Sequence, residues 1–256
     1  MSFRDFWTNE NNPSLPKSEY LYGTRHILVL VATLVACIVF TWIFCKRSDR
    51  AKKILFRAFA SILLFFEIAS RVVNLIIAES YTLESVMKIL LPMHICSVMV
   101  WVFIIAIFTQ KKFLLNFSVL GGVLATIAFL LYPAVGLNKT YITFTCFYSI
   151  FSHMLGFITC ILLMTLGQVK FEFKKIWQPI VCFAIMFGWG VLLDWVIFPG
   201  EDYMYLRNDP LELGLSFPYQ LLYLGIILVY ITMFYLVDFI KDKIKNKRLQ
   251  RATDKK

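Results

Sequence analysis

Apolar residues run along this chain in seven long stretches that shorter polar segments separate. A helix needs about 20 apolar residues to cross the hydrocarbon core of a bilayer, which is about 30 Å thick. Each stretch reaches this length, and no gap between them is long enough for a separate soluble domain. The pattern predicts an all-α, polytopic integral membrane protein with seven transmembrane helices, at His26–Cys45, Ile54–Ala78, Ser85–Phe108, Phe113–Val135, Tyr141–Leu166, Ile176–Phe198 and Phe217–Ile240.

The composition agrees with a membrane protein. Hydrophobic residues make up 59% of the 256 residues and charged residues only 16%, and the mean hydropathy is +0.72. A soluble domain averages about 45–50% apolar and about 25% charged residues. Because a soluble fold of this length cannot bury so much apolar surface, an ordinary cytosolic enzyme, a disulfide scaffold and a disordered chain are excluded.

The basic residues predict the orientation in the membrane. With the N-terminus outside, the cytoplasmic side collects nineteen of the 26 Lys and Arg, as the positive-inside rule requires. Residues 1–25 are then an extracellular segment, residues 26–240 the transmembrane domain and residues 241–256 a basic cytoplasmic tail of a multi-pass cell-membrane protein. The net charge of +10 is therefore a topology signal, and we predict no nucleic-acid partner.

The first apolar stretch and the cysteines carry two further expectations. The stretch is longer than the apolar core of a signal peptide and lacks a nearby small-residue cleavage site, which predicts a retained helix. The six cysteines are scattered and form no C-x-x-C pair, so we expect neither a zinc site nor a disulfide. Nothing in the sequence indicates a cofactor.

Polar residues inside the predicted helices are costly in a bilayer and mark functional sites by default. Glu67 and Arg71 are four residues apart, so they share a helix face and can pair. His94 and His153 lie at similar depths in the third and fifth helices. Polar residues gather in the outer halves of the helices, which predicts an outward-facing intramembrane pocket lined by Glu67, Arg71, Asn74, Tyr148, Asp194 and Gln220.

Two histidines at one depth could act as general acid and base. The candidate nucleophiles are Cys96, Ser97 and Ser149. His94 and Ser97 are three residues apart and Ser149 and His153 four, so each pair shares a face of a regular helix. Cys96 faces away from His94 unless Pro92 distorts the turn. A nucleophile with a histidine partner indicates acyl transfer or ester hydrolysis, although each of these residues also suits a structural role in helix packing.

Two segments carry a resemblance to a known family: LPMHICSVMVW, at Leu91–Trp101, and FYSIFSHMLGFI, at Phe147–Ile158. With them the chain resembles the bacterial YwaF-like integral membrane proteins, which belong with the eukaryotic transmembrane protein 164 family, over roughly residues 20–240. The resemblance implies transfer of a fatty acyl chain between phospholipids through a cysteine acyl-enzyme, with histidine assistance from His94 and His153. In that family the cysteine directly precedes the first histidine; this chain has Met93 there, and Cys96 is the nearest thiol.

These observations predict a lipid-modifying membrane enzyme, an acyltransferase or lipid hydrolase, with a membrane lipid as substrate or ligand. Two alternatives remain open. One is a small-molecule or ion permease component, in which Glu67, Arg71, His94 and Asp194 bind a solute or proton; the other is a non-catalytic lipid-binding membrane protein. The almost purely apolar inner halves of the helices argue against a continuous pore. The sequence identifies no protein partner.

Overall fold

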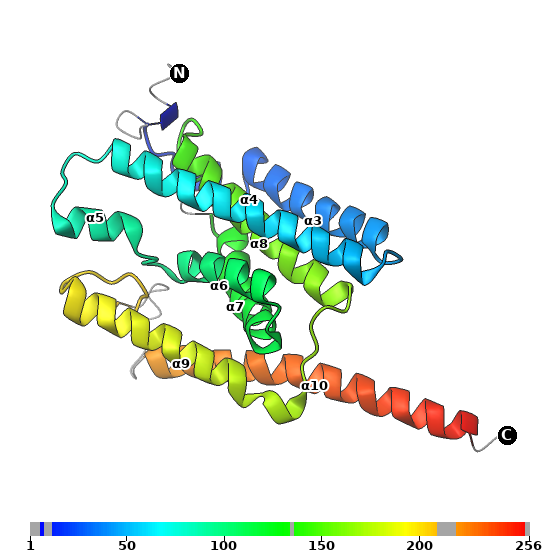
Figure 1. The fold of residues 1–256 in the computed structure, drawn as a ribbon. Coiled ribbons are helices and arrows are strands. Elements are labelled where there is room, and N and C mark those ends of the chain that lie inside the picture. The colour runs from blue at the N-terminus through cyan, green and yellow to red at the C-terminus, as the bar shows by residue number, and fades with distance from the viewer. Residues whose placement is uncertain (1–5, 8–11, 134–135, 209–218, 254–256) are drawn as a thin grey trace. The chain divides into compact units, whose positions relative to one another are not determined.

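The computed structural model describes residues 6–7, 12–133, 136–208 and 219–253, with side chains up to residue 244 (Figure 1). The regular secondary structure of the described residues is helical. Their only strand-like pairings are two isolated β-bridges. The chain divides into two compact units, Met1–Gln168 and Val169–Lys256. The expected helix ends at Val135 and Phe217 lie outside the described residues.

The first unit holds most of the helices, and side-chain caps mark where several of them begin. Ser48, Thr82 and Thr143 each accept a hydrogen bond from a backbone N–H in the first turn of the helix that follows, which satisfies a donor that the helix itself leaves open. In chain order the helices are α2 (Lys17–Tyr20), α3 (Thr24–Phe44), α4 (Asp49–Ile76), α5 (Leu83–Leu90), α6 (Ile95–Thr109), α7 (Lys112–Leu131) and α8 (Phe144–Thr165).

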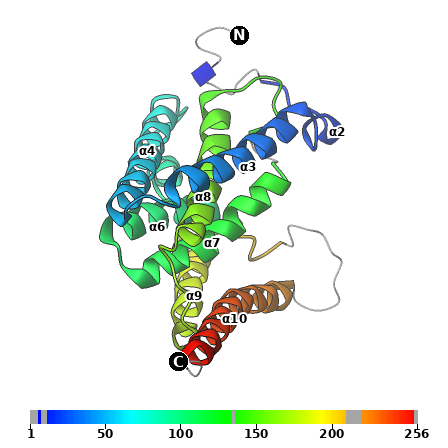
Figure 2. The same cartoon turned by 90° about the vertical axis from the view of Figure 1, so that its right-hand side faces the viewer.

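Helix α8 lies at the centre of the first unit, where it packs against α3, α4, α6 and α7 (Figure 2). Leu120, Leu162 and Phe103 are fully buried in this core. The outward faces are also apolar: Trp42 on α3 is 78% exposed, and many large hydrophobic side chains on α3 and α4 are exposed as well. Such faces suit a lipid environment, because water would make their exposure unfavourable.

Close helix packing in this unit depends on glycine. A Cβ atom on Gly122 would lie 2.5 Å from the ring of Phe103 and 2.8 Å from the sulfur of Cys160. The α7 backbone therefore approaches α6 and α8 more closely than any side chain at this position would allow, as small residues permit in membrane helix bundles.

Gly122→Ala is expected to destabilise the protein by about 1–3 kcal/mol, because the added methyl group overpacks a buried contact. The matched control is Gly188→Ala on a helix of the second unit, where a Cβ would meet nothing within 4 Å and alanine favours the helix by up to about 1 kcal/mol. Unfolding free energies measured in mixed micelles separate the two. Equal effects of the two substitutions would contradict this packing.

The third apolar stretch is not one continuous helix. It is divided into α5 and α6, which are bent by 57° relative to each other, with an extended segment between them (Figure 1). Pro92 lies in this break, where its missing N–H and its ring prevent the helix from continuing. The expected span Ser85–Phe108 is therefore present as a bent pair of helices, and the distortion considered at Pro92 is larger than one altered turn.

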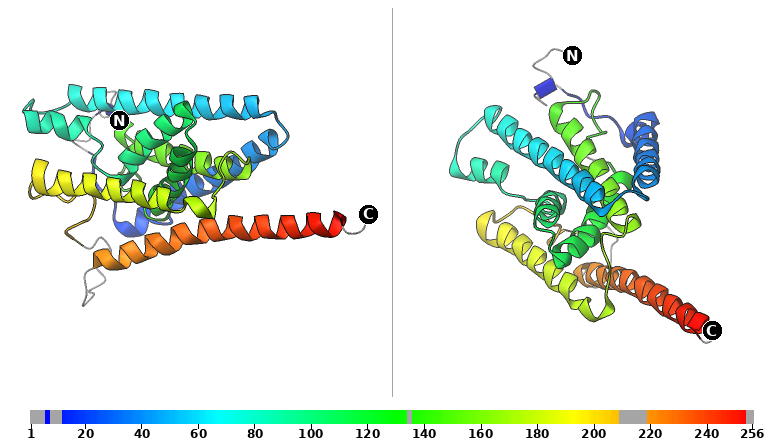
Figure 3. Two further views of the ribbon diagram at one scale, coloured as in Figure 1. Left: turned by 60° about the horizontal axis from the view of Figure 1, so that its bottom comes forward. Right: turned by 45° about the vertical axis from the view of Figure 1, so that its right-hand side comes forward.

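The second unit contains the 3₁₀ turn η1 (Phe173–Lys175), α9 (Trp177–Val191), the π-helix η2 (Leu192–Ile197) and α10 (Tyr219–Thr253). Asp238 on α10 accepts a hydrogen bond from the backbone N–H of Phe171 at 3.1 Å. Asp242 pairs with Lys170 at 2.8 Å, and this hydrogen bond raises the pKa of Lys170 above its usual value. Helix α10 continues without interruption beyond Ile240, where the membrane segment was expected to end (Figure 3).

Six helical segments among the described residues are long and apolar enough to cross a membrane, and the bent pair α5–α6 adds a seventh if it counts as one span. The all-α fold class with six to seven apolar spans is therefore confirmed. The orientation of the termini stays a prediction.

Candidate functional site

An ion pair buried on α4 lies at the centre of the candidate site. Nε and Nη2 of Arg71 both donate to Oε1 of Glu67, the first at 2.9 Å, and the Glu67 side chain is 2% exposed. The other carboxylate oxygen of Glu67 accepts a hydrogen bond from the hydroxyl of Tyr148 on α8. The pairing expected from the four-residue spacing is present, and both carboxylate oxygens have donors, as a buried carboxylate requires.

Arg71 also binds the break between α5 and α6. Its Nη1 donates to the carbonyl oxygen of Leu91 at 2.9 Å and to that of Ile89. The last carbonyl groups of a helix lack partners within it, and Pro92 provides no N–H to satisfy one of them. The guanidinium supplies a donor to the carbonyl groups of Ile89 and Leu91, so the Glu67–Arg71 pair stabilises the end of α5 at the break.

Cys96 is the second residue of α6, directly after this break. Its thiol lies beside its own backbone N–H, the N–H of Ser97 and the Ser97 hydroxyl, and it is close enough to Glu67 and Tyr148 to interact electrostatically with both. Free N–H groups at a helix N-terminus stabilise a thiolate and an oxyanion in the same place. Five of the residues singled out in the sequence therefore lie near the break between α5 and α6: Glu67, Arg71, Tyr148, Cys96 and Ser97.

His94 is not part of the helix that carries Cys96. It is the exposed N-cap residue of α6, with extended backbone angles (φ −90°, ψ 156°), and its side chain makes no capping hydrogen bond. The regular helix assumed from His94 to Ser97 begins only at Ile95, so the sharing of one face by His94 and Ser97 stays a prediction. Met93, the residue directly before His94, is only 5% exposed.

His153 is buried in α8 with its ring stacked on that of Phe129, at 3.9 Å between centroids. Its Nδ1 lies 2.6 Å from the main-chain carbonyl oxygen of Ser149. Because a carbonyl oxygen only accepts hydrogen bonds, Nδ1 carries the proton, and the neutral ring has its lone pair on Nε2. His153 and Ser149 are in contact, as their spacing indicates, but through the backbone of Ser149 and not through its hydroxyl.

The sequence matches the model of the TMEM164 family over residues 21–238. The chain belongs to the TMEM164 family. Since that family is a membrane protein family and the structure has six to seven apolar spans, this chain is a multi-pass membrane protein. No curated protein and no solved structure matches it.

The match to the TMEM164 family includes two candidate residues of the second unit, Asp194 and Gln220. Asp194, fully buried in the π-helix, accepts a hydrogen bond at Oδ1 from the N–H of Tyr203 at 3.0 Å, and its main-chain carbonyl accepts one from Arg207. Gln220 donates to the carbonyl oxygen of Leu206 at 2.9 Å. Both residues hold the segment that follows η2 within their own unit.

Asn74 is the remaining candidate. It lies on α4, three residues after Arg71, and is half-buried. Among the described residues of this TMEM164-family chain, no group of three His, Cys, Asp or Glu side chains is placed to hold a metal ion.

A buried histidine near the start of α3 is a residue that the sequence does not single out. His26 accepts a hydrogen bond at Nδ1 from the N–H of Tyr22 at 3.0 Å, and its Nε2 donates to the carbonyl oxygen of Leu130 at 2.6 Å. With both ring nitrogens engaged, it ties α3 to the end of α7. Neither partner is evident from the sequence, because both are main-chain groups, which every residue has. One of them is more than a hundred residues away.

Proposed function

We propose that this protein is a lipid-modifying membrane enzyme, an acyltransferase or lipid hydrolase, with Cys96 as its nucleophile. The position of the thiol carries the proposal: it lies at the open N-terminus of α6, beside the N–H groups of Cys96 and Ser97. The acyl transfer implied by the sequence resemblance needs a nucleophile of this kind. We further propose that it acts in the cell membrane, with the N-terminus outside, the C-terminus cytoplasmic and an outward-facing pocket.

The reaction has two steps. The Cys96 thiol gives up its proton, and the sulfur attacks the carbonyl carbon of an ester-linked acyl chain on a phospholipid. The ester C–O bond breaks, the departing lysophospholipid oxygen takes up a proton, and the acyl chain stays on Cys96 as a thioester. The hydroxyl oxygen of a second lysolipid then attacks the thioester carbonyl, the C–S bond breaks, and the hydroxyl proton passes to the sulfur of Cys96. Water in place of the lysolipid gives hydrolysis.

The start of α6 can stabilise the charge that develops in both steps. The tetrahedral intermediate carries a negative oxygen, and backbone N–H groups are the donors that commonly stabilise such an oxyanion. The residues beside Glu67 and Tyr148 suit an acyl chain. Phe66 on α4 lies with its ring centroid 5.8 Å from that of Phe147 and 5.0 Å from that of Phe151 on α8, which makes an aromatic surface next to the polar network.

In this proposal, His94 and His153 move the protons. His94 precedes Cys96 by two residues, and His153 has the tautomer that a general base needs, with a lone pair on Nε2. Glu67, whose two oxygens bind Arg71 and Tyr148, positions the thiol through the helix break.

A trapped acyl-enzyme tests the proposed function. Purified protein in nanodiscs is incubated with a phospholipid that carries an alkyne-tagged acyl chain, and labelled peptides are mapped by mass spectrometry. We expect a hydroxylamine-sensitive label on Cys96 and none on Cys45, a thiol that is more exposed. Absence of the label, or equal labelling of Cys45, would contradict the proposal.

In that case, the accessibility of cysteines substituted along α4, α6 and α8 tests whether the protein is a permease component. Accessibility from both membrane faces supports transport, and a closed inner side supports a lipid-binding protein.

His153→Ala is expected to slow labelling of Cys96 by about 10²–10⁴-fold, the usual contribution of a general base. His94→Ala is expected to act in the same direction. Labelling rates with the tagged phospholipid, followed by in-gel fluorescence, give the comparison. Equal rates for wild type and both histidine variants would remove these residues from the mechanism while leaving Cys96 as a candidate.

A further inference from the structure

The segment before α3 lies as a strap against the loop between α7 and α8. Residues 12–22, which include α2, form this N-terminal strap. The backbone N–H of Leu15 donates to the carbonyl of Asn138 at 2.7 Å, and the N–H of Thr140 donates to the carbonyl of Pro13 at 3.1 Å. Main-chain hydrogen bonds therefore fix the first residues of the strap to a loop far away in the sequence.

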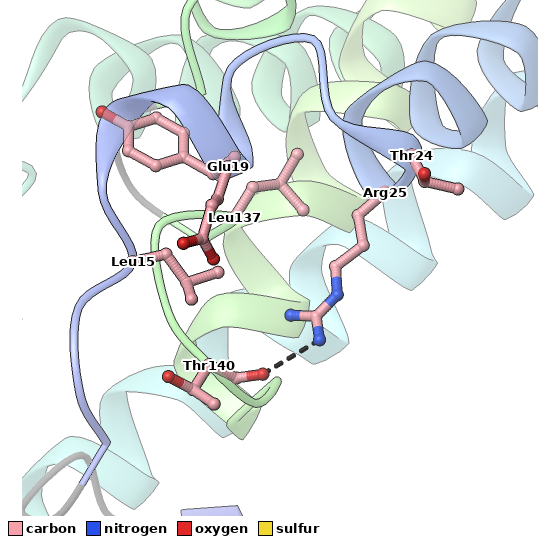
Figure 4. A pocket seen from close by; sticks show the side chains of 7 residues that line it. Leu15, Glu19, Thr24, Arg25, Leu137 and Thr140 are labelled. Carbon is pink, nitrogen blue, oxygen red and sulfur yellow. Dashed lines mark hydrogen bonds between the residues drawn. The ribbon is translucent and has the colours of Figure 1, made fainter.

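Little apolar packing holds the rest of the N-terminal strap. Helix α2 has no buried residue. A pocket of about 260 Å³ lies between the strap, the α7–α8 loop and the first turn of α3, with Leu15, Leu137 and Arg25 among the residues that line it (Figure 4). A segment with few buried contacts is among the first to open in a folded protein. Polar contacts are therefore what keeps the strap closed.

Tyr22 ends the strap in a backbone conformation that is unfavourable for its residue type. Its φ angle is 58°, in the left-handed region that glycine adopts readily and bulky residues rarely do. Such a conformation persists only where surrounding contacts stabilise it. Here the N–H of Tyr22 donates to Nδ1 of His26 at 3.0 Å, and the two rings stack with 5.1 Å between their centroids. His26 therefore stabilises the turn that joins the strap to α3.

Only the neutral form of His26 satisfies both of its hydrogen bonds. Nδ1 accepts from Tyr22 and so carries no proton, while Nε2 donates its proton to the carbonyl of Leu130 at 2.6 Å. A second proton, on Nδ1, would point at the N–H of Tyr22 and replace an attraction with a repulsion. It would also charge a side chain that is fully buried, which is costly without a counter-ion. The closed contact therefore excludes this proton.

The surroundings of His26 offer the charged ring no counter-ion. Both hydrogen-bond partners of the ring are backbone groups, and among the described residues no carboxylate forms an ion pair with it. The titratable and charged groups on the segments that contact the start of α3 are Lys17, Glu19 and Tyr20 in the strap, Arg25 on α3, Tyr132 after α7, Lys139 in the α7–α8 loop and His153 on α8. Since three of them are cations and only one is an acid, they favour the neutral ring.

We propose that His26 is a pH-sensitive latch for the N-terminal strap. At neutral pH the uncharged ring holds Tyr22 and the strap is closed. When Tyr22 moves away, Nδ1 of His26 reaches water and binds a proton, and the charged ring can no longer accept a hydrogen bond from Tyr22. A histidine in water titrates at about pH 6.5. Because the open state binds a proton that the closed state excludes, closure is favoured above this pH and is lost progressively below it. The latch is separate from the chemistry proposed at Cys96 and does not depend on it.

Amide hydrogen exchange of the full-length protein in nanodiscs tests the latch. Exchange is measured at about pH 7.5 and about pH 5.5, on either side of the titration of histidine, and is corrected for its intrinsic pH dependence. We expect the amides of Leu15, Tyr22 and Thr140 to exchange about tenfold faster at the lower pH, as uptake of one proton by the open state requires. The amide of Leu166 at the other end of α8, which donates to the carbonyl of Leu162 at 2.9 Å, is the internal reference and should not respond.

Substitutions at His26 and at an exposed histidine provide the controls. His26→Asn keeps an acceptor near the position of Nδ1 that cannot be protonated, so exchange in the strap should be the same at both pH values. His26→Gln, which also cannot be protonated and can still donate a hydrogen bond, is the second variant and should be equally insensitive to pH. His94→Asn removes an exposed histidine at the start of α6 and should keep the tenfold response. A pH response that persists in either His26 variant, or that is absent from the wild type, would overturn the proposal.

Discussion

Cys96→Ala is expected to abolish the acyl-enzyme and to lower the rate of phospholipid acyl transfer by about 10⁴-fold or more, as loss of a catalytic nucleophile does in other covalent enzymes. The physical reason is that the Cys96 thiol lies beside the open N–H groups at the start of α6, which stabilise the negative charge that develops in the reaction. Release of lysophospholipid, followed by mass spectrometry of the reaction mixture, measures the rate.

Three variants serve as controls for Cys96→Ala. Cys45→Ala removes an exposed thiol and should leave the rate unchanged. Ser149→Ala should also have little effect, because His153 contacts the carbonyl of Ser149 and not its hydroxyl. Ser97→Ala should reduce the rate only by about tenfold, since its hydroxyl contributes one hydrogen bond to the thiol. Full activity of Cys96→Ala, with loss of activity in Ser97→Ala or Ser149→Ala, would move the nucleophile to a serine.

Arg71→Met is expected to reduce the free energy of unfolding by about 3–5 kcal/mol, because it leaves the carboxylate of Glu67 buried without its cation. It also removes the donors to the carbonyl groups of Ile89 and Leu91 at the helix break. The double variant Glu67→Gln/Arg71→Met should be less destabilised than the sum of the single variants, which a double-mutant cycle measures as a coupling energy. Unfolding in mixed micelles provides the free energies.

The chain contains a matched control for this ion pair. Lys88 and Glu84 on α5 have the same four-residue spacing and are 2.9 Å apart, but both side chains are partly exposed. Lys88→Met should therefore cost at most about 1 kcal/mol, as exposed ion pairs usually do. A loss for Arg71→Met no larger than that for Lys88→Met would contradict a buried structural role for Arg71.

The Glu67–Arg71 pair shows which contacts the local spacing of residues in the sequence can predict. Two residues four apart on a helix face the same way in any environment, so the sequence predicts their contact. The remaining contacts of Glu67 and Arg71 do not follow from local spacing. The hydroxyl of Tyr148 comes from a helix 81 residues away, and the Ile89 and Leu91 carbonyls are main-chain groups that every residue has. No pattern in the sequence identifies which of them Arg71 and Glu67 reach.

Pro92, four residues before the proposed nucleophile Cys96, also shows what the sequence alone cannot predict. A proline inside an apolar stretch indicates a distortion, but its size depends on whether other groups stabilise the exposed backbone. Here Arg71 does so, the helix breaks completely, and His94 becomes an N-cap residue in place of a helical neighbour of Ser97. The break also brings Cys96 to the start of a helix.

The sequence by itself determined the class of the protein, the approximate position of its apolar spans and its internal ion pair, because lipid exposure demands long apolar stretches and local helical spacing sets which neighbours meet. Tertiary structure decided the rest. The contacts of Glu67 and Arg71 with Tyr148 and the carbonyl groups of the break depend on how helices are rotated and how closely they approach. Those distances follow from packing of interlocking side chains, such as Phe103 against the bare backbone of Gly122, which many similar apolar sequences could arrange differently.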